Sequence, residues 1–333
     1  MLGSIINVFI SWEVTVLANI ALLNRCNLKC PYCFADSYTG ETSEDITIDT
    51  FNRLLDFCAD EGRVGLIGGE PFLHKDIAKI LEILTQDWRI SLVTVFTNGI
   101  FIDKALSLLA HPKFKLLVNV NPSSDIGKGA FERTRENIRS ALSIMRLDRV
   151  DLGINVYKEN QDFDEFLDIV KECGVRRVRI SVVIPQDKSE GGIPYFKRMK
   201  QTLLDLYTRL KEMNVCPCYD CNAIPECVFD RDELDFLSTL PFENQLEREI
   251  FLGKRSVCSP VIDLYPDLTA SRCFGICSPR VPIGDFLSIR DLGNFFFKEI
   301  DCRLINTPSC EDCEGCYKYK TFGCYGGCLC YKK

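Results

Sequence analysis

The sequence has three cysteines within eight residues, in the stretch CNLKCPYCFA that begins at Cys26. Cys26, Cys30 and Cys33 have the spacing C-x3-C-x2-C, and thiolates this close together can bind one face of an iron–sulfur cube. Such a set leaves one iron without a protein ligand. Two other interpretations of the spacing stay open: a zinc site completed by a distant fourth ligand, or three unligated buried thiols.

Cysteine is abundant in the rest of the chain as well, with 19 cysteines among 333 residues. Only Cys58 and Cys173 separate the first three from a second group, which lies between residues 216 and 330. The two isolated cysteines fall in predicted helices, where we expect small buried apolar side chains. In a long chain, cysteines distributed in this way are typical of metal sites rather than of a secreted disulfide framework.

The composition excludes some classes of function. The net charge is −7, whereas nucleic-acid binding calls for a basic surface. The N-terminus has no basic segment ahead of an apolar run and no small-residue cleavage site, so we expect no signal peptide. Glu13 and Asn19 interrupt the first apolar run, and no other segment is long enough to span a membrane. We therefore expect a soluble, cytoplasmic protein.

Short apolar runs alternate with helical patterns from residue 13 through the first two thirds of the chain. The stretch TIDTFNRLLDFCAD is typical, because a threonine that can cap a helix precedes apolar residues spaced by three and four. Six strand–helix pairs predict an α/β fold with a parallel sheet, and ligand sites beyond the carboxyl ends of its strands. The alternation fits both a partial barrel and an open doubly wound sheet.

The chain changes character after about residue 215, where cysteine, proline, glycine and aspartate replace the strand–helix alternation. This part would bury little apolar surface unaided, so metal sites would have to supply cross-links. We therefore predict two domains: residues 1–210 form the alternating α/β unit, and residues 211–333 form a small cysteine-rich α+β unit.

The segment CNLKCPYCF resembles the signature of the radical S-adenosylmethionine (SAM) enzymes, with Tyr32 at their usual aromatic position. In that family the amino and carboxylate groups of SAM chelate the iron that lacks a protein ligand. The resemblance implies a [4Fe–4S] cluster on Cys26, Cys30 and Cys33. It also implies reductive cleavage of SAM to a 5′-deoxyadenosyl radical that abstracts hydrogen from a substrate. It covers about residues 14–200 and implies the partial (β/α)6 barrel.

Other strand ends agree with the family pattern and supply candidate contacts to SAM. The GGEP stretch that begins at Gly68 matches the motif near the methionine amino group, and Glu70 can accept hydrogen bonds from an ammonium. The TNG stretch closes the next strand, and asparagines close the two after it; for each asparagine a turn or surface role is the alternative. The candidate SAM-binding residues are Tyr32, Gly68, Gly69, Glu70, Thr97, Asn98, Asn119, Asn121, Asn155 and Ser181.

The C-terminal cysteines resemble a second motif, that of the SPASM and twitch extensions, which carry auxiliary [4Fe–4S] clusters. The matching stretch is Cys313-x2-Cys316-x7-Cys324-x3-Cys328, with a middle gap two residues longer than usual. Upstream, a C-x14-C pair resembles the cysteines that flank a hairpin. The resemblance implies a nearer cluster on Cys258, Cys273 and Cys328 with Cys221 or Cys227, and an outer cluster on Cys313, Cys316, Cys324 and Cys330. Structural zinc is the alternative for this half of the chain.

Auxiliary-cluster members of the family mostly modify peptides, which favours a peptide maturase that forms a cross-link, a thioether or an epimerised residue. Phe274 follows Cys273 where sulfatase-maturing members have a general-base Asp, and this disfavours formylglycine formation, although Asp263 and Asp267 lie upstream. Two alternatives stay open. One is a small-molecule radical SAM dehydrogenase or carbon–carbon bond former, and the other is a non-catalytic zinc-binding scaffold.

The same interpretation predicts partners. A peptide maturase requires a ribosomally made peptide as substrate and an electron donor such as flavodoxin or ferredoxin. Because the predicted barrel begins almost at the first residue, a leader peptide would need a separate protein to bind it, or the substrate is small.

Overall fold

The computed structural model describes residues 17–33, 45–184, 192–219, 224–253, 258 and 261–332. The strands are β1 (Leu17–Ala21), β2 (Arg63–Ile67), β3 (Leu92–Thr97), β4 (Phe114–Asn119), β5 (Val150–Val156), β6 (Arg177–Val182), β7 (Cys216–Cys218), β8 (Val261–Leu264), β9 (Thr269–Ser271) and β10 (Val281–Pro282). The first half of the predicted strand at residues 13–22 lies outside the described residues.

The α-helices fall between and after these strands. They are α2 (Ile48–Cys58), α3 (Ile77–Gln86), α4 (Leu106–Leu109), α5 (Ser123–Ile126), α6 (Lys128–Ile144), α7 (Asp164–Cys173), α8 (Gly192–Glu212), α9 (Arg231–Leu237), α10 (Gln245–Phe251), α11 (Ile289–Phe296), α12 (Cys302–Ile305), α13 (Glu311–Gly315) and α14 (Tyr317–Lys320). A π-helical turn, Phe297–Asp301, joins α11 to α12.

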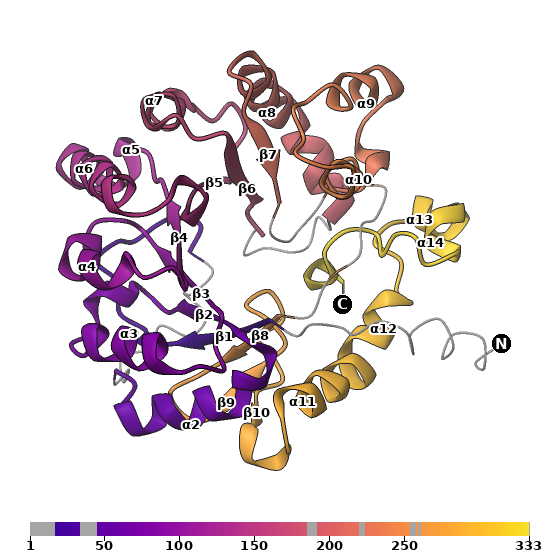
Figure 1. Ribbon diagram of the computed structural model, residues 1–333. Helices are drawn as coiled ribbons and strands as arrows, with labels where there is room; N and C mark the ends of the chain where they lie inside the picture. The colour runs from indigo at the N-terminus through magenta and orange to yellow at the C-terminus, as the bar shows by residue number, and fades with distance from the viewer. Residues whose placement is uncertain are drawn as a thin grey trace.

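All ten described strands form one sheet in the order β10-β9-β8-β1-β2-β3-β4-β5-β6-β7. Strand β8 and strands β1 to β7 all run parallel to one another, whereas β9 pairs antiparallel with both β8 and β10. From β1 to β7 each strand pairs with the next in sequence, so the order never reverses as it does in a doubly wound sheet. The helices lie along the outer side of the curved row of strands (Figure 1). The fold is therefore a partial α/β barrel.

Local sequence signals explain the elements that were predicted. Thr47 caps α2 by accepting a hydrogen bond from the Thr50 amide, and the buried residues of the helix follow the predicted spacing. Gly174 ends α7 in the left-handed conformation, which glycine adopts without the penalty of a Cβ. Cys58 is fully buried in the core, as expected, and Cys173 is only half-buried at the end of its helix.

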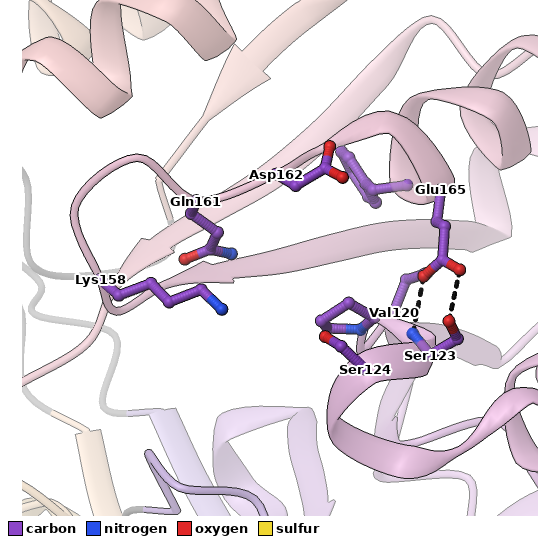
Figure 2. A pocket seen from close by; sticks show the side chains of 9 residues that line it. Val120, Ser123, Ser124, Lys158, Gln161, Asp162 and Glu165 are labelled. Atoms are coloured by element: carbon purple, nitrogen blue, oxygen red, sulfur yellow. Dashed lines mark hydrogen bonds between the residues drawn. The ribbon is translucent and has the colours of Figure 1, made fainter.

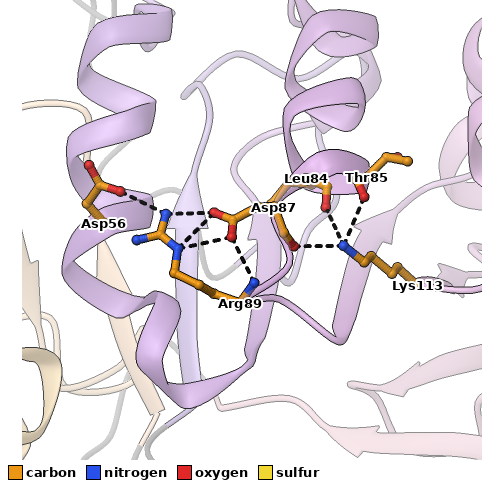
Figure 3. Close-up of polar contacts among 6 residues, drawn as sticks. All are labelled: Asp56, Leu84, Thr85, Asp87, Arg89 and Lys113. Carbon is orange, nitrogen blue, oxygen red and sulfur yellow. Dashed lines mark hydrogen bonds and ion pairs between the residues drawn. The ribbon is translucent and has the colours of Figure 1, made fainter.

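Partly exposed polar contacts hold the edge of the sheet at the amino ends of β3 and β4 (Figure 3). Arg89, which precedes β3, bonds to Asp87 at 2.7 Å and to Asp56 on α2 at 2.8 Å. Lys113, which precedes β4, donates to the backbone oxygens of Thr85 and Asp87 at 2.9 and 2.7 Å, just where α3 ends. These contacts fix the helices on the edge opposite to the strand ends that carry the predicted site.

The cysteine-rich part of the chain extends the same sheet. Strand β7 pairs with β6 at one edge, and the β8–β9 hairpin pairs through β8 with β1 at the other. The predicted domain boundary at residue 210 lies inside α8, so the division into two domains stays a prediction. Short helices α11 to α14 follow the strands, in agreement with a small α+β region. None of the helices in the described parts of the chain is both long and apolar enough to cross a membrane.

Candidate functional site

The three N-terminal cysteines lie on one loop, residues 26–33, which follows β1 and is called the cysteine loop below. A turn brings the ends of the C-x2-C pair together, because the Cys33 amide donates to the Cys30 oxygen at 3.1 Å. Burial raises the pKa of Cys30 to about 12, and the nearby Cys33 and Cys26 thiols add to the shift. Burial also raises the pKa of Cys26. The thiols therefore lie close enough together to oppose one another's ionisation. A bound cation would instead favour the ionised thiolates.

The two glycines after β2 hold the cysteine loop by direct backbone packing. The Gly69 amide donates to the Leu23 oxygen at 2.9 Å, and the Glu70 amide donates to the Arg25 oxygen at 3.1 Å. A Cβ on Gly68 would lie 2.4 Å from the Leu23 oxygen, and one on Gly69 would lie 2.1 Å from the Arg25 oxygen. Only glycine allows this approach. The sequence predicted close backbone approach to a ligand here, and the structure uses the same glycines to position the cysteine loop.

Glu70 links the ends of β2 and β3 beneath the cysteine loop. Its carboxylate is fully buried and accepts hydrogen bonds from the Thr97 hydroxyl and the Asn98 amide, both at 2.8 Å, and from the Phe72 amide at 3.2 Å. Burial raises its pKa to about 7, although these donors favour the charged form. The Asn98 side chain then reaches the loop, since its amide nitrogen donates to the Asn27 side-chain oxygen at 2.9 Å. Glu70, Thr97 and Asn98 thus form one connected network.

A second network joins the cysteine loop to the end of β4. The Tyr32 hydroxyl donates to the side-chain oxygen of Asn121, which also accepts a bond from the Asn119 amide nitrogen at 2.8 Å. Asn121 is buried. The Asn119 side-chain oxygen is buried and has no hydrogen-bond partner among the described residues. An unpaired buried acceptor is costly, so this oxygen is a suitable place for a ligand donor.

The structure adds two residues that the sequence analysis did not select. The Tyr157 ring lies against the Tyr32 ring with centroids 4.5 Å apart, and its hydroxyl donates to Asp125 at 2.6 Å. Tyr157 directly follows β5. The sequence analysis selected asparagines because they lie at strand ends, and the same criterion could have found Tyr157. Asp125 lies in α5 and carried no such signal. Together they form a wall beside the cysteine loop.

Asn155 and Ser181 face each other across neighbouring strands, since they are register partners on β5 and β6. The side-chain oxygen of Asn155 accepts a bond from Arg179 at 3.2 Å. Ser181 is partly exposed. The parallel strands thus bring these two predicted residues together. They lie on β5 and β6, the two strands that follow β4 in the sheet.

A small pocket of about 210 Å³ lies at the carboxyl ends of β4 and β5 (Figure 2). Glu165 closes one wall by accepting bonds from the Ser123 amide and hydroxyl at 2.6 and 2.5 Å. Lys158 and Gln161 line the opposite wall. The pocket is adjacent in sequence to Asn121 and Tyr157, so it flanks the candidate site.

The C-terminal cysteines gather in two groups. The first thiol group surrounds the turn after β9, and its members are Cys258, Cys273, Cys328 and Cys330. The second thiol group surrounds α13, and its members are Cys227, Cys310, Cys313, Cys316 and Cys324. The resemblance implied Cys330 for the outer cluster and Cys221 or Cys227 for the nearer one, whereas the structure places Cys330 in the first thiol group and Cys227 in the second. Cys221 lies outside the described residues.

A buried ion pair accompanies the first thiol group. Arg272 is 1% exposed and donates to both carboxylate oxygens of Asp301 at 2.9 and 3.0 Å. Another of its nitrogens lies 3.5 Å from the Cys258 sulfur. Burial raises the pKa of Cys258 to about 11, and the Arg272 charge opposes that rise. The arginine therefore favours anionic sulfur at this position.

The two carboxylates upstream of Cys273 occupy different surroundings. Asp263 is fully buried on β8, accepts a bond from the Asn19 side chain at 2.8 Å, and has its pKa raised to about 7 by burial. Its second oxygen has no hydrogen-bond partner among the described residues. Asp267 lies in the exposed hairpin turn, where it bonds to Thr269. Of these two carboxylates, only that of Asp263 is buried.

The donor atoms fit iron–sulfur clusters. In the described ranges, no three Cys, His, Asp or Glu side chains are gathered tightly enough to bind one metal ion. A [4Fe–4S] cluster binds each thiolate through a different iron, so its thiolates lie further apart than those around a single metal ion. Each group consists of thiols, a donor set that suits both iron–sulfur clusters and zinc.

The comparisons with known proteins agree with this fold and site. Residues 20–168 match the family model described as the Radical SAM superfamily. The protein is thus an α/β-barrel protein with a thiol-bearing loop at the carboxyl end of its first strand. The match covers just under half of the chain and supports a radical SAM domain in its barrel part, and that family implies a [4Fe–4S] cluster and SAM as cofactors.

Two curated relatives match part of the chain. A GTP 3′,8-cyclase from Desulforamulus reducens is 29% identical over 180 residues, which are 50% of this chain and 54% of the relative. The subtilosin biosynthesis protein AlbA from Bacillus subtilis is 31% identical over 134 residues, which are 37% of this chain and 29% of AlbA. The chain spans about half the length of the first of these and less of the second.

Several solved structures match nearly the whole chain. One of them is that of anSMEcpe with bound AdoMet and the Kp18Cys peptide, with a TM-score of 0.63 and 16% sequence identity. The match covers 94% of this chain and 89% of anSMEcpe. At this identity the likeness concerns the fold, and it includes most of the cysteine-rich part.

Proposed function

We propose that the protein is a radical SAM enzyme that modifies a peptide, with two auxiliary iron–sulfur clusters in a SPASM-like C-terminal region. The observation that carries this proposal is the extent of the fold likeness to anSMEcpe, a protein solved with AdoMet and a peptide. That likeness of fold covers 94% of the chain and thus extends into the cysteine-rich part, and the sequence match to the GTP cyclase covers 50% of the chain. The similarity to AlbA, named for the biosynthesis of a bacteriocin, supports the same choice.

When bound, the cluster and SAM supply an electron and a 5′-deoxyadenosyl radical that removes hydrogen from the substrate. The chain contributes ligands and a fixed loop. Cys26, Cys30 and Cys33 would hold the cluster, and the glycine packing after β2 fixes the backbone that carries them. The Glu70 network ties that backbone to β3, so the loop has little freedom to move.

The strand ends of β4, β5 and β6 would bind SAM. Asn119 offers an unpaired buried oxygen that can accept a bond from an amino or hydroxyl group. Asn121 is held in place by Tyr32, and Asn155 and Ser181 continue the polar edge on the next two strands. The Tyr32 and Tyr157 rings pack against each other at a tilt beside the loop and would shield a reactive radical there from water.

Asp263 is the proposed proton acceptor near the auxiliary clusters. No aspartate follows Cys273 directly. Asp263 is buried on β8, which only β1 separates from β2, and one of its carboxylate oxygens has no hydrogen-bond partner among the described residues. A pKa of about 7 suits a group that takes up a proton near neutral pH. The auxiliary clusters would receive the electron that the product radical loses, and flavodoxin or ferredoxin would reduce the N-terminal cluster.

Anaerobic reconstitution tests the proposal. The purified protein with dithionite and SAM should form 5′-deoxyadenosine, and synthetic peptides encoded by short reading frames beside the gene should raise that yield and change in mass. A separate leader-binding protein, if required, would be supplied from the same gene neighbourhood. Iron and sulfide analysis distinguishes the enzyme from a zinc-binding scaffold, since zinc without sulfide would contradict any cluster chemistry.

A small-molecule reaction is the second candidate, because the relatives include proteins named GTP 3′,8-cyclase. The same assay with GTP in place of peptide tests it. Consumption of GTP coupled to 5′-deoxyadenosine would support the cyclase-like reaction and overturn the peptide proposal. SAM cleavage that responds to a peptide and not to GTP would do the reverse.

A further inference from the structure

We propose that the two thiol groups bind separate [4Fe–4S] clusters with one ligand exchanged relative to the sequence expectation. The first cluster takes Cys258, Cys273, Cys328 and Cys330, and the second takes Cys227, Cys313, Cys316 and Cys324. This inference rests on the auxiliary clusters of the proposed function and specifies which thiolates hold each one.

Packing assigns Cys330 to the first thiol group. Its sulfur lies 3.2 Å from the Cys328 sulfur. A Cβ on Gly275 would lie 2.7 Å from the Cys330 Cβ and 3.3 Å from its sulfur. Gly275 belongs to the tight turn in which Cys273 and Ile276 bridge each other. Cys330 therefore sits directly on the turn that begins with another member of the group.

The surroundings of Cys330 keep it there. It lies in a short 3-10 helix, Leu329–Tyr331, whose three residues are all buried. The Tyr331 ring packs edge-on against Phe196 of α8, with centroids 5.7 Å apart. Moving Cys330 toward α13 would expose this apolar helix, so the packing opposes the outer assignment.

A separate set of contacts assigns Cys227 to the second thiol group. Its neighbour Glu226 forms an ion pair with Lys318 of α14 at 2.5 Å. A Cβ on Gly327 would meet the Pro225 ring at 3.5 Å, so the chain on both sides of Cys324 packs on the segment around Cys227. The Cys227 thiol is also within electrostatic reach of all four other members of the group. The element that precedes α9 thus faces α13 and α14.

Four ligands must be chosen from the five thiols of the second group. The Cys310 sulfur lies 3.6 Å from the Cys313 sulfur, and the two residues belong to the same short segment. Cys227 comes from a different segment and faces the whole group, so it can complete a cube from the side opposite α13. The geometry therefore favours Cys227 over Cys310.

Each thiol group also has a buried cation beside it, which independently indicates anionic sulfur. Arg272 serves the first group through its contact with Cys258. Lys332 is 9% exposed, donates to the Leu304 oxygen at 2.8 Å, and lies within electrostatic reach of Cys313, Cys324 and Cys328. Asp301 already balances the charge of Arg272, so thiolate at Cys258 would add to that pair.

The test uses the full chain with Cys26, Cys30 and Cys33 replaced by alanine, so that only auxiliary clusters are counted. We expect about eight irons per chain in this background. Adding Cys330→Ala or Cys227→Ala should each leave about four irons or produce a three-iron EPR signal, whereas Cys310→Ala and Cys302→Ala should keep about eight. Serine replacements at the same positions repeat the measurement where an alanine variant does not fold.

Alkylation of the wild-type holoprotein provides a second readout without mutation. Under anaerobic conditions Cys227 and Cys330 should become reactive only when a chelator removes the iron, and Cys310 should react equally before and after. Protection of Cys310 with reaction of Cys227, or retention of about eight irons in both key variants, would overturn the ligand assignment and leave the proposed function intact. About four irons in the wild-type protein would instead remove the auxiliary clusters from the proposed function, and the assignment with them.

Discussion

In the cysteine loop three thiols come from eight consecutive residues, whereas each C-terminal thiol group draws cysteines from segments far apart in the sequence. The loop is held by backbone packing against Gly68 and Gly69 and by hydrogen bonds to neighbouring strand ends. The first C-terminal group depends on β8, β9 and the last turn of the chain meeting one another. A local site needs only a rigid support, and a dispersed site needs the fold around it.

The two regions also differ in how they handle buried charge. Beneath the cysteine loop, Glu70 accepts bonds from neutral donors and keeps a raised pKa. Beside the first thiol group, Asp301 is paired with Arg272 in a fully enclosed ion pair. We infer that the network beneath the cysteine loop tolerates protonation of Glu70. The C-terminal region depends instead on the charged pair of Arg272 and Asp301.

The largest expected effect is on SAM cleavage. Cys30→Ala should abolish 5′-deoxyadenosine formation and lower the iron content by about four per chain, because two thiolates cannot hold the N-terminal cluster. Chromatography of the reaction mixture and iron analysis measure both. Cys173→Ala, at the end of a helix, is the control and should retain activity. Full activity of the Cys30 variant would disprove the role of the cysteine loop.

The C-terminal ion pair gives the next largest effect. Arg272→Met should lower the free energy of unfolding by about 3–5 kcal/mol, because it leaves the Asp301 carboxylate buried without a partner. Urea unfolding measures the change. Arg146→Met breaks an exposed pair with Asp148 and should cost about 0.5 kcal/mol or less. Equal effects of the two substitutions would remove the contrast between buried and exposed charge.

Substitutions of the two residues of this pair should shift the midpoint potential of the first auxiliary cluster in opposite directions. Arg272→Gln removes a positive charge next to Cys258 and should lower the midpoint potential of that cluster. Asp301→Asn keeps the arginine, removes the negative charge and should raise the potential. Potentiometric EPR titration compares the variants. Shifts of the same sign would indicate that both act through structural damage rather than through charge.

The N-terminal carboxylate predicts a pH dependence of stability. The folded-state pKa of Glu70 is about 7, above the ordinary value of 4.5, so the folded chain keeps a proton that the unfolded chain has lost. The free energy of unfolding should therefore fall by about 3 kcal/mol between pH 4.5 and 7 and stay level above that range. Urea unfolding at several pH values should give this slope for the wild type and a flatter one for Glu70→Gln. Identical profiles would contradict the raised pKa.

Backbone packing beneath the cysteine loop gives a smaller expected change. Gly69→Ala brings a Cβ to 2.1 Å from the Arg25 oxygen and should cost about 1–3 kcal/mol, with loss of the N-terminal cluster ahead of the C-terminal ones. Unfolding and iron analysis measure the two effects. Gly284→Ala is the matched control, because no atom lies within 4 Å of its Cβ position. A Gly69 variant as stable as this control would show that the packing is not required.

The smallest expected change concerns the Tyr32 hydroxyl. Tyr32→Phe keeps the ring contact with Tyr157 and removes the bond to Asn121, so stability should fall by about 1 kcal/mol. Tyr317→Phe, on an exposed ring, should change stability by less than about 0.5 kcal/mol. The comparison by urea unfolding tests whether the polar network holds the cysteine loop.

Much of the barrel and of the cysteine loop followed from the order of residues. Apolar alternation predicted six strand–helix units, and short-range signals such as the Thr47 cap and the glycine after α7 predicted where helices begin and end. The spacing of Cys26, Cys30 and Cys33 indicated a cluster site as one of three interpretations, because residues so near in sequence cannot be far apart in space. These features depend on a few neighbouring residues and therefore show in the sequence.

Tertiary structure decided the features that depend on distant contacts. It joined β8 to β1, turned the Glu70 carboxylate toward β3, enclosed Arg272 with Asp301, and distributed the C-terminal thiols between two groups. The family resemblance implied other neighbours for Cys330 and, with Cys221 as its alternative, for Cys227, since a short stretch of chain can turn toward either group. The packing of Tyr331 on α8 and of Glu226 on Lys318 selects the direction, and those contacts exist only in the folded chain.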